Sequence, residues 1–232
     1  MDIRALVFDV FGTLVDWRSG VGREAARIFG QDSLIDGGAF ADAWRSHYQP
    51  SMEAVRTGQR RWVDLDILHS ESLELVLSQF GRPDLGSSAK HEMVQAWHRL
   101  DAWPEVRDAL TRLRERFILA PLSNGHVALS IALARRNGLI WDAILGAEFA
   151  RDYKPNPAVY LSAVEALRLK PQNVLMVACH SSDLAAAASC GLPTAHIARP
   201  NERGPGRGEA RPEVPVDLRA SDLLDLARQL AG

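Results

Sequence analysis

Four groups of polar residues in this chain are of the types that carry out covalent hydrolysis. They are the carboxylates of Asp9 and Asp183, the amine of Lys154, and the pair Ser123-Asn124. An ionised carboxylate held in a fixed orientation can act as a nucleophile, and a second carboxylate can activate water. A lysine beside them would keep the nucleophile charged, because an opposite charge favours the carboxylate over the acid. These residue types suit a covalent mechanism if the fold brings them together.

The polar groups end or interrupt short apolar runs, and these runs alternate with helical patterns. The apolar runs predict buried strands at residues 3–8, 117–122, 143–147, 173–178 and 193–198. The helical patterns cover residues 105–116, 128–137, 157–169, 182–190 and 221–230. This alternation predicts an α/β fold with a Rossmann-like parallel sheet and helices on both faces. Right-handed crossovers then place all strand carboxyl ends at one edge, where ligands bind. Pro121 predicts a strand end or an edge position within the second run.

Residues 17–97 break the alternation. They contain helical patterns and no convincing strand, and the patterns cover residues 22–29, 40–48, 62–80 and 89–99. We expect this segment to be a helical cap inserted after the first strand, over the carboxyl edge of the sheet. Residues 1–16 and 98–232 would then form the catalytic core.

Composition argues against several classes of partner. The 232 residues include 27 basic and 29 acidic side chains, for a net charge of −2. This balance gives no electrostatic reason to expect nucleic acid or an anionic membrane as a partner. No apolar stretch approaches the ~18–20 residues of a membrane span, and the first residues lack the apolar core of a signal peptide. With only two cysteines and no disulfide pattern, we expect a cytoplasmic protein.

Four short motifs resemble those of the haloacid dehalogenase superfamily, in the same order along nearly the whole chain. They are Asp9-Val-Phe-Gly-Thr-Leu-Val, Leu122-Ser-Asn-Gly, Tyr153-Lys-Pro and Val177-Ala-Cys-His-Ser-Ser-Asp. The resemblance implies that Asp9 is the nucleophile and that Lys154 and Asp183 are catalytic. Thr13, in the first motif, would aim one oxygen of Asp9.

Two departures from the superfamily pattern argue against a phosphatase. Superfamily phosphatases carry a second aspartate two residues after the nucleophile, where this chain has Phe11, and Gly-Asp where it has Ala178-Cys179. Mg²⁺ prefers oxygen ligands, which a phenylalanine and a thiol do not supply. We therefore expect neither metal nor cofactor. The first motif instead resembles that of the L-2-haloacid dehalogenases, with Phe11 at the substrate pocket.

The same resemblance implies further contacts to the substrate. Arg45 matches a cap-helix arginine that holds halide or carboxylate, and Tyr160 matches an active-site tyrosine. Ser123 and Asn124 would donate to the substrate carboxylate. A solvent-facing arginine and a core tyrosine are the alternatives for the first two residues.

His180 is a departure within this branch, whose better-known members have an asparagine at that position. An imidazole can change charge near neutral pH, so it could act as a second base or as a halide donor. We therefore predict that His180→Asn loses activity on fluoroacetate disproportionately. A structural histidine is the alternative.

The function expected from these residues is that of an (S)-2-haloacid dehalogenase. It would convert short 2-haloacids to 2-hydroxy acids with inversion, through an ester on Asp9. One alternative is a metal-independent hydrolase of another small 2-substituted acid, for example one that opens the ring of azetidine-2-carboxylate. Another is a catalytically weak binding or regulatory member of the superfamily. The resemblance also suggests a homodimer.

Overall fold

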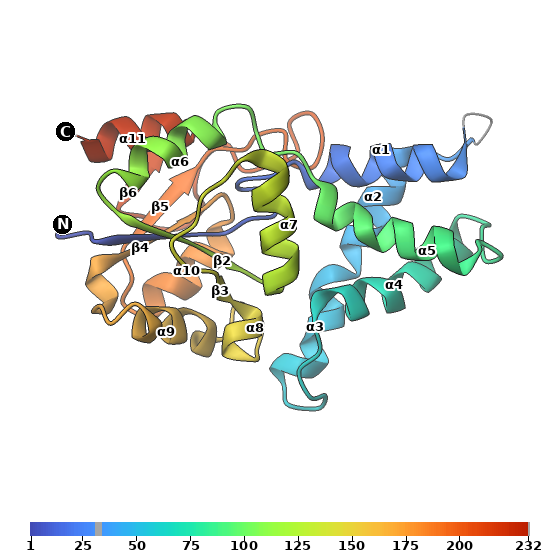
Figure 1. The fold of residues 1–232 in the computed structure, drawn as a ribbon, viewed down its shortest axis with the longest axis horizontal. Coiled ribbons are helices and arrows are strands. Elements are labelled where there is room, and N and C mark those ends of the chain that lie inside the picture. Colours follow the sequence, from blue (N-terminus) through green and yellow to red (C-terminus); the bar gives the residue numbers. More distant parts are fainter. Residues whose placement is uncertain (31–33, 232) are drawn as a thin grey trace.

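The computed structural model describes residues 1–30 and 34–231 and has the α/β architecture expected from the sequence (Figure 1). Its sheet is parallel throughout, with the strand order β3-β2-β1-β4-β5-β6. The strands are β1 (Ala5–Phe8), β2 (Ile118–Ser123), β3 (Leu145–Gly146), β4 (Val174–Ala178), β5 (Thr194–Ile197) and β6 (Leu218–Ala220).

The central strand β1 shows why its apolar run forms a buried strand. It pairs with β2 on one side and β4 on the other, and all four of its residues are buried. Leu6 and Phe8 belong to one apolar cluster, while Ala5 and Val7 belong to the cluster on the opposite face. Side chains alternate between faces with a period of two, so a strand covered on both sides must be apolar throughout.

Helices cover both faces of the sheet (Figure 1). One face packs against α6 (Val106–Arg114), α7 (Val127–Asn137) and α11 (Leu223–Ala231). The opposite face packs against α9 (Pro157–Ala166) and α10 (Ser181–Ser189). The short helix α8 (Ala147–Ala150) and the 3₁₀ turn η2 (Pro171–Asn173) complete this part of the chain.

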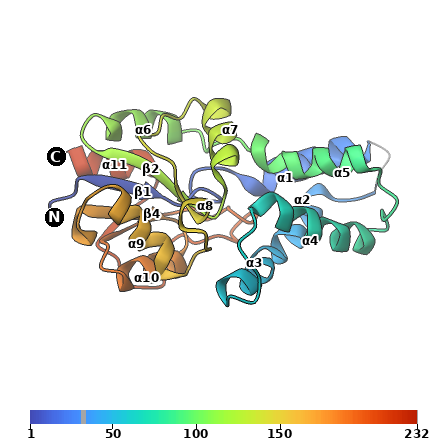
Figure 2. The same cartoon turned by 60° about the horizontal axis from the view of Figure 1, so that its bottom comes forward.

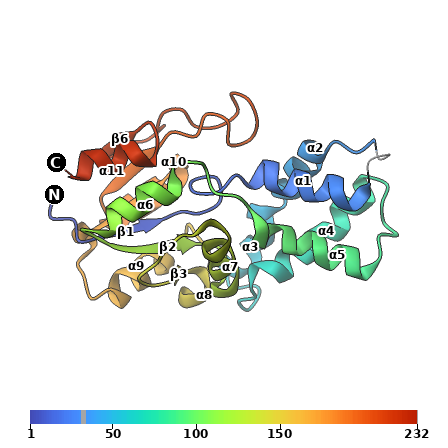
Figure 3. The ribbon, with the colours of Figure 1, turned by 45° about the horizontal axis from the view of Figure 1, so that its top comes forward.

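The remaining helices lie together beyond the sheet, away from the two chain ends (Figures 2 and 3). They are α1 (Trp17–Phe29), α2 (Gly37–Ser46), α3 (Tyr48–Arg56), α4 (Leu65–Gln79), α5 (Ser87–Val94) and the 3₁₀ helix η1 (Gln95–Arg99). We refer to these helices as the helical layer. The cap boundaries at residues 17 and 97 stay a prediction.

The apolar core continues from the sheet into the helical layer. Trp97 packs edge-on against Phe11 with ring centroids 5.7 Å apart, and it stacks with Trp17 at 6.4 Å. Trp44 also packs edge-on against Trp97, at 5.5 Å. These aromatic contacts fix the helical layer against the loop that follows β1.

Three local features differ from the sequence prediction. The helix predicted over residues 40–48 ends at Ser46, and α3 begins at Tyr48, so Pro50 falls in a first turn that tolerates proline. Strand β6 was not predicted, because three residues of mixed burial carry little periodic signal. Pro121 lies within β2 opposite Phe8, but β3 pairs only with the last two residues of β2.

Within residues 1–30 and 34–231, no helix combines the length and apolar character that crossing a membrane requires.

Candidate active site

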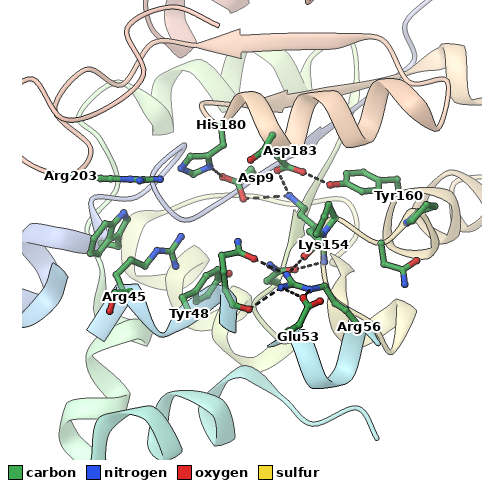
Figure 4. Close-up of a pocket in the computed structure, with 18 of the residues that line it drawn as sticks. Asp9, Arg45, Tyr48, Glu53, Arg56, Lys154, Tyr160, His180, Asp183 and Arg203 are labelled. Atoms are coloured by element: carbon green, nitrogen blue, oxygen red, sulfur yellow. Dashed lines mark hydrogen bonds and ion pairs between the residues drawn. The ribbon is translucent and has the colours of Figure 1, made fainter. Parts of the chain in front are cut away.

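The carboxyl ends of the strands converge on a cavity of about 940 Å³ that also contacts the helical layer (Figure 4). Asp9 follows β1, Asn124 follows β2, and Asp183 lies in the first turn of α10, which follows β4. Lys154 enters from the loop between α8 and α9. These four side chains, which the sequence predicted to meet, all line the cavity.

Asp9 is held through both of its carboxylate oxygens. Oδ2 accepts a hydrogen bond from the Thr13 hydroxyl at 2.8 Å and lies 3.2 Å from His180 Nδ1. Among the described residues, Oδ1 has only the longer contact to Lys154 Nζ, at 3.4 Å. Thr13 Oγ1 is itself fixed, because it accepts the backbone N–H of Cys179 at 2.9 Å. Oδ1 is therefore the oxygen that is freer to attack a substrate.

The electrostatic surroundings keep Asp9 ionised. Burial alone would raise the pKa of this carboxyl, but Lys154, His180 and the Thr13 hydroxyl together hold it well below its usual range. A buried anion with a depressed pKa is a ready nucleophile that needs no base to remove a proton.

Asp183 has a different environment from Asp9, although both contact Lys154. Its Oδ2 accepts from Lys154 Nζ at 2.6 Å, and its Oδ1 accepts from the Tyr160 hydroxyl at 2.5 Å. Burial and the negative charge of Asp9 raise the pKa of Asp183 despite the opposing effect of Lys154. For Lys154, burial would lower the pKa, but the two carboxylates raise it. Asp183 is thus the more basic carboxylate, which fits the base rather than the nucleophile.

Arg45 points from α2 into the cavity (Figure 4). Its Cζ lies 3.7 Å from the ring centroid of Tyr48, 5.2 Å from that of Trp17 and 5.6 Å from that of Phe11. Its Nη1 is buried and has no hydrogen-bond partner among the described residues. A buried donor without a partner costs about 1–3 kcal/mol, which a bound anion would recover.

Two sequence-predicted residues lie behind the cavity wall. Phe11 is 2% exposed and supports Tyr48 and Trp97 with edge-on ring contacts. Ser123 is 1% exposed, and its hydroxyl accepts the backbone N–H of Gly125 at 3.0 Å. Direct contacts of Phe11 and Ser123 with the substrate stay predictions. In the structure, Phe11 supports the aromatic rings around Arg45, and Ser123 orders the loop that carries Asn124.

Tyr160 and Asn124 reach the cavity but also have partners of their own. The Tyr160 hydroxyl is occupied by Asp183, and Asn124 Oδ1 accepts the backbone N–H of Lys154 at 2.8 Å. The amide nitrogen of Asn124 is the part of this side chain suited to a carboxylate substrate.

The environment of His180 differs from what the sequence suggested. Its Nδ1 faces Asp9, and its Nε2 lies 3.2 Å from Oε1 of Glu202. Burial would lower the pKa of this imidazole, but the Cys179 thiol and the two carboxylates raise it well above its usual range. With both ring nitrogens engaged, His180 has no N–H left for a departing halide in this arrangement. This geometry therefore disfavours a role for His180 as a direct hydrogen-bond donor to the halide.

Glu202 was missed by sequence reasoning. It lies in a Gly- and Arg-rich segment, residues 199–209, outside every predicted helix and strand. In the structure it is 3% exposed, and its Oε1 accepts from the indole N–H of Trp17 at 2.7 Å. Burial would raise the pKa of Glu202, but His180 and Trp17 lower it to about 2. No local pattern marked this residue, because its partners are remote in the sequence.

Arg56, another residue missed by sequence reasoning, bridges the helical layer and the core. Its Nη1 donates to the backbone oxygen of Lys154 at 3.0 Å, and its Nη2 donates to Glu53 Oε2 at 2.7 Å. The contact ties the end of α3 to the loop that carries Lys154.

The comparisons with known proteins agree with this geometry. A model of the haloacid dehalogenase-like hydrolase family matches residues 3–191. The chain belongs to this family. It is 32% identical over 206 residues to (S)-2-haloacid dehalogenase 1 of Pseudomonas sp. (strain CBS-3), covering 86% of each chain.

Solved structures of family members cover nearly the whole chain. A defluorinating L-2-haloacid dehalogenase is 42% identical, with a TM-score of 0.95 over 99% of this chain and 96% of the other. A second L-2-haloacid dehalogenase is 45% identical, with a TM-score of 0.93 over 99% of each chain. The L-2-haloacid dehalogenase of Xanthobacter autotrophicus with chloropropionic acid covalently bound is 27% identical, with a TM-score of 0.84 and 99% coverage of both chains.

The family's phosphatases imply Mg²⁺, and the residues here do not fit that ion. Phe11 replaces the second aspartate and lies behind the cavity wall. The Lys154 amine contacts one oxygen of each carboxylate, and the His180 ring contacts the second oxygen of Asp9. The second oxygen of Asp183 accepts from the Tyr160 hydroxyl, so each oxygen already has a partner.

A softer metal also fits poorly. Asp9, Cys179 and His180 offer three atoms within 4.8 Å of one another. However, burial raises the pKa of the Cys179 thiol, which disfavours the thiolate that binds metals.

Proposed function

We propose that the protein is an (S)-2-haloacid dehalogenase that hydrolyses short 2-haloacids through an ester on Asp9. The observation that carries this proposal is the pair of buried carboxylates that share Lys154, one with a depressed pKa and one with a raised pKa. The first is suited to attack carbon and the second to activate water. The covalently bound chloropropionic acid of the Xanthobacter relative supports the ester.

In the first step, Asp9 Oδ1 attacks C2 of the substrate from the side opposite the halogen. The new O–C2 bond forms as the C2–halogen bond breaks, and the halide leaves with the bonding electron pair. Arg45, whose buried Nη1 has no partner among the described residues, supplies positive charge for the halide or the substrate carboxylate. Asn124 supplies an amide donor at the cavity wall. A single displacement at C2 inverts its configuration.

In the second step, water attacks the ester carbonyl carbon of Asp9. Asp183 takes the proton from this water, and the Cγ–O bond of the ester breaks. The departing alkoxide takes this proton back from Asp183 and leaves as the 2-hydroxy acid. The new carboxyl group of Asp9 releases the second proton of the water and returns as a carboxylate. Since water attacks Asp9 and not C2, the inverted configuration is kept.

Halide and proton release across a panel of short 2-haloacids tests this function. We expect release from (S)-2-chloropropionate and not from its (R) enantiomer, with (R)-lactate as the product. Release from neither enantiomer, together with ring opening of azetidine-2-carboxylate, would replace the proposed substrate class. The absence of any turnover on the panel would favour a binding or regulatory role.

Three finer properties are also part of the proposed function: metal independence, a homodimeric state and a cytoplasmic location. Within the described residues both cysteines are free, which suits a reducing compartment. The homodimer rests on the resemblance alone, and sedimentation of the purified protein tests it.

Exhaustive chelation should leave the rate of dehalogenation unchanged, and added Mg²⁺ should not raise it. The reason is that Lys154 and His180 occupy the carboxylate oxygens that a cation would need. Initial rates before and after EDTA treatment measure this. A loss of activity that Mg²⁺ restores, or rapid hydrolysis of phosphate monoesters, would contradict it.

His180→Asn should lower turnover of chloro-, bromo- and fluoroacetate by a similar factor, on the order of tenfold or more. Both nitrogens of the ring face carboxylates and not the halide. The substitution should therefore slow hydrolysis of the Asp9 ester, which is the same for all three substrates. The ratio of kcat values across the three acids is the measurement. A selective loss on fluoroacetate would instead support the halide-donor role first suggested by the sequence.

A further inference from the structure

Glu202, His180 and Asp9 form a line of hydrogen-bonding groups that ends at the proposed nucleophile. The two ring nitrogens of His180 lie 3.2 Å from Glu202 Oε1 and 3.2 Å from Asp9 Oδ2. Ionised carboxylates only accept hydrogen bonds, and a neutral imidazole has a single N–H. Each ring nitrogen can present an N–H to its carboxylate only when His180 carries two N–H groups, as the imidazolium.

The position of Glu202 is built into the surrounding structure. Trp17 donates its indole N–H to the same Oε1 atom, and the backbone N–H of Glu202 donates to the Arg199 carbonyl at 3.1 Å. Gly12 in the nucleophile loop has a φ of +88°, and a Cβ at this position would collide with the Glu202 side chain. The loop after β1 therefore leaves room for a carboxylate from a remote segment.

We infer that Glu202 is a positioning residue that holds His180 as an imidazolium, hydrogen-bonded to Glu202 through Nε2 and ion-paired with Oδ2 of Asp9 through Nδ1. The catalytic consequence of this inference rests on the proposed function, whereas the protonation state of the His180 ring does not. The titratable or charged groups around the pair are Asp9, Arg45, Cys179, His196 and Arg203.

The imidazolium matters most after the ester has formed. If Oδ1 becomes the ester oxygen, Oδ2 becomes the carbonyl oxygen, and Asp9 no longer carries the charge that stabilised His180. Glu202 is then the carboxylate that keeps the ring protonated. When water attacks the carbonyl carbon, negative charge develops on Oδ2, which faces the Thr13 hydroxyl and the His180 N–H. Removing one preorganised donor from such an oxyanion commonly lowers kcat by about 10²–10³-fold.

The first arm of the test measures the protonation of His180 directly. Glu202→Gln keeps the size and an acceptor oxygen but removes the charge. We expect ¹⁵N NMR of the imidazole nitrogens to show His180 losing its proton at least about one pH unit lower in this variant than in the unaltered protein. A neutral His180 ring at neutral pH in the unaltered protein, or an unchanged titration in the variant, would overturn the inference.

Glu105→Gln is the matched control. Glu105 pairs with Arg199 at 2.6 Å and so anchors the same late segment without contacting His180. It should leave the His180 titration unchanged, which separates the charge of Glu202 from general loosening of the segment. An equal shift in both variants would assign the effect to structure. If Glu202→Gln does not fold, Glu202→Asp replaces it and should retain a charged His180 while weakening its position.

The second arm follows the ester in a pre-steady-state reaction with (S)-2-chloropropionate. Glu202→Gln should slow ester hydrolysis about tenfold to a hundredfold, with little change in the initial release of chloride. Intact mass should therefore show the esterified protein accumulating. Equal slowing of both steps, or no slowing, would overturn the catalytic role. If the NMR result holds and no acid on the panel is dehalogenated, the proposed function fails while the positioning of His180 stands.

Discussion

Replacing Asp9 with alanine should abolish dehalogenation, lowering kcat by about 10⁴-fold or more. The reason is that Oδ1 of this residue is the atom that forms the bond to C2, and no other carboxylate replaces it. Asp183, which shares Lys154 with Asp9, is held by Lys154 and Tyr160 through its two oxygens. Halide release under substrate saturation measures the effect.

A single turnover in ¹⁸O-labelled water gives a sharper test of the same step. The ester oxygen that leaves with the product comes from Asp9, so the first product should contain no label and Asp9 should gain it. Label in the first product would mean that water attacks C2 directly. Asp108→Ala serves as the control, because Asp108 is an exposed carboxylate on α6, outside the cavity. It should leave kcat unchanged.

Replacing Lys154 with methionine should lower kcat/KM by about 10³-fold at neutral pH. The Lys154 amine lies 3.4 Å from Asp9 Oδ1 and 2.6 Å from Asp183 Oδ2, so its loss leaves two buried carboxylates without their shared cation. The pKa of Asp9 should then rise, since Lys154 lowers it. Because the nucleophile must be ionised, the acid limb of the activity profile should move to higher pH.

The pH dependence of kcat/KM, with a thermal unfolding scan, separates this effect from loss of structure. Removing one partner from a buried ion pair costs several kcal/mol, so a lower Tm is expected as well. Lys170→Met is the matched control, because Lys170 is exposed and does not line the cavity. An active Lys154→Met protein with an unmoved acid limb would remove this lysine from the mechanism.

The fold and the meeting of the two carboxylates were predictable because their signals are local. Asp9 follows an uninterrupted apolar run, and Asp183 opens the helix after another, so the topology alone brings them to one edge. The strand boundaries shifted by one or two residues. Arg45 was expected at the site only because it matches a cap-helix arginine of the family, and the structure places it at the cavity wall.

The environment of His180 was not predictable, because its ionisation depends on contacts between distant parts of the chain. Glu202 is 185 positions from Trp17, and nothing in its own neighbourhood distinguishes it from the exposed charges beside it. The sequence therefore suggested a histidine free to donate to halide. The structure instead places each of its nitrogens against a carboxylate. The contact of Arg56 with the Lys154 carbonyl escaped prediction for the same reason.

The indole of Trp17 is a fluorescent group that contacts two charged residues of the candidate active site, Glu202 and Arg45. This ring donates to Glu202, stacks on Trp97 and lies under the Arg45 guanidinium. Indole emission responds to nearby charge, so the arrival of an anion at Arg45 and the neutralisation of Asp9 would each perturb it. Stopped-flow recording of the intrinsic fluorescence would then resolve substrate capture, ester formation and ester breakdown in real time, without a dye or a coupled assay.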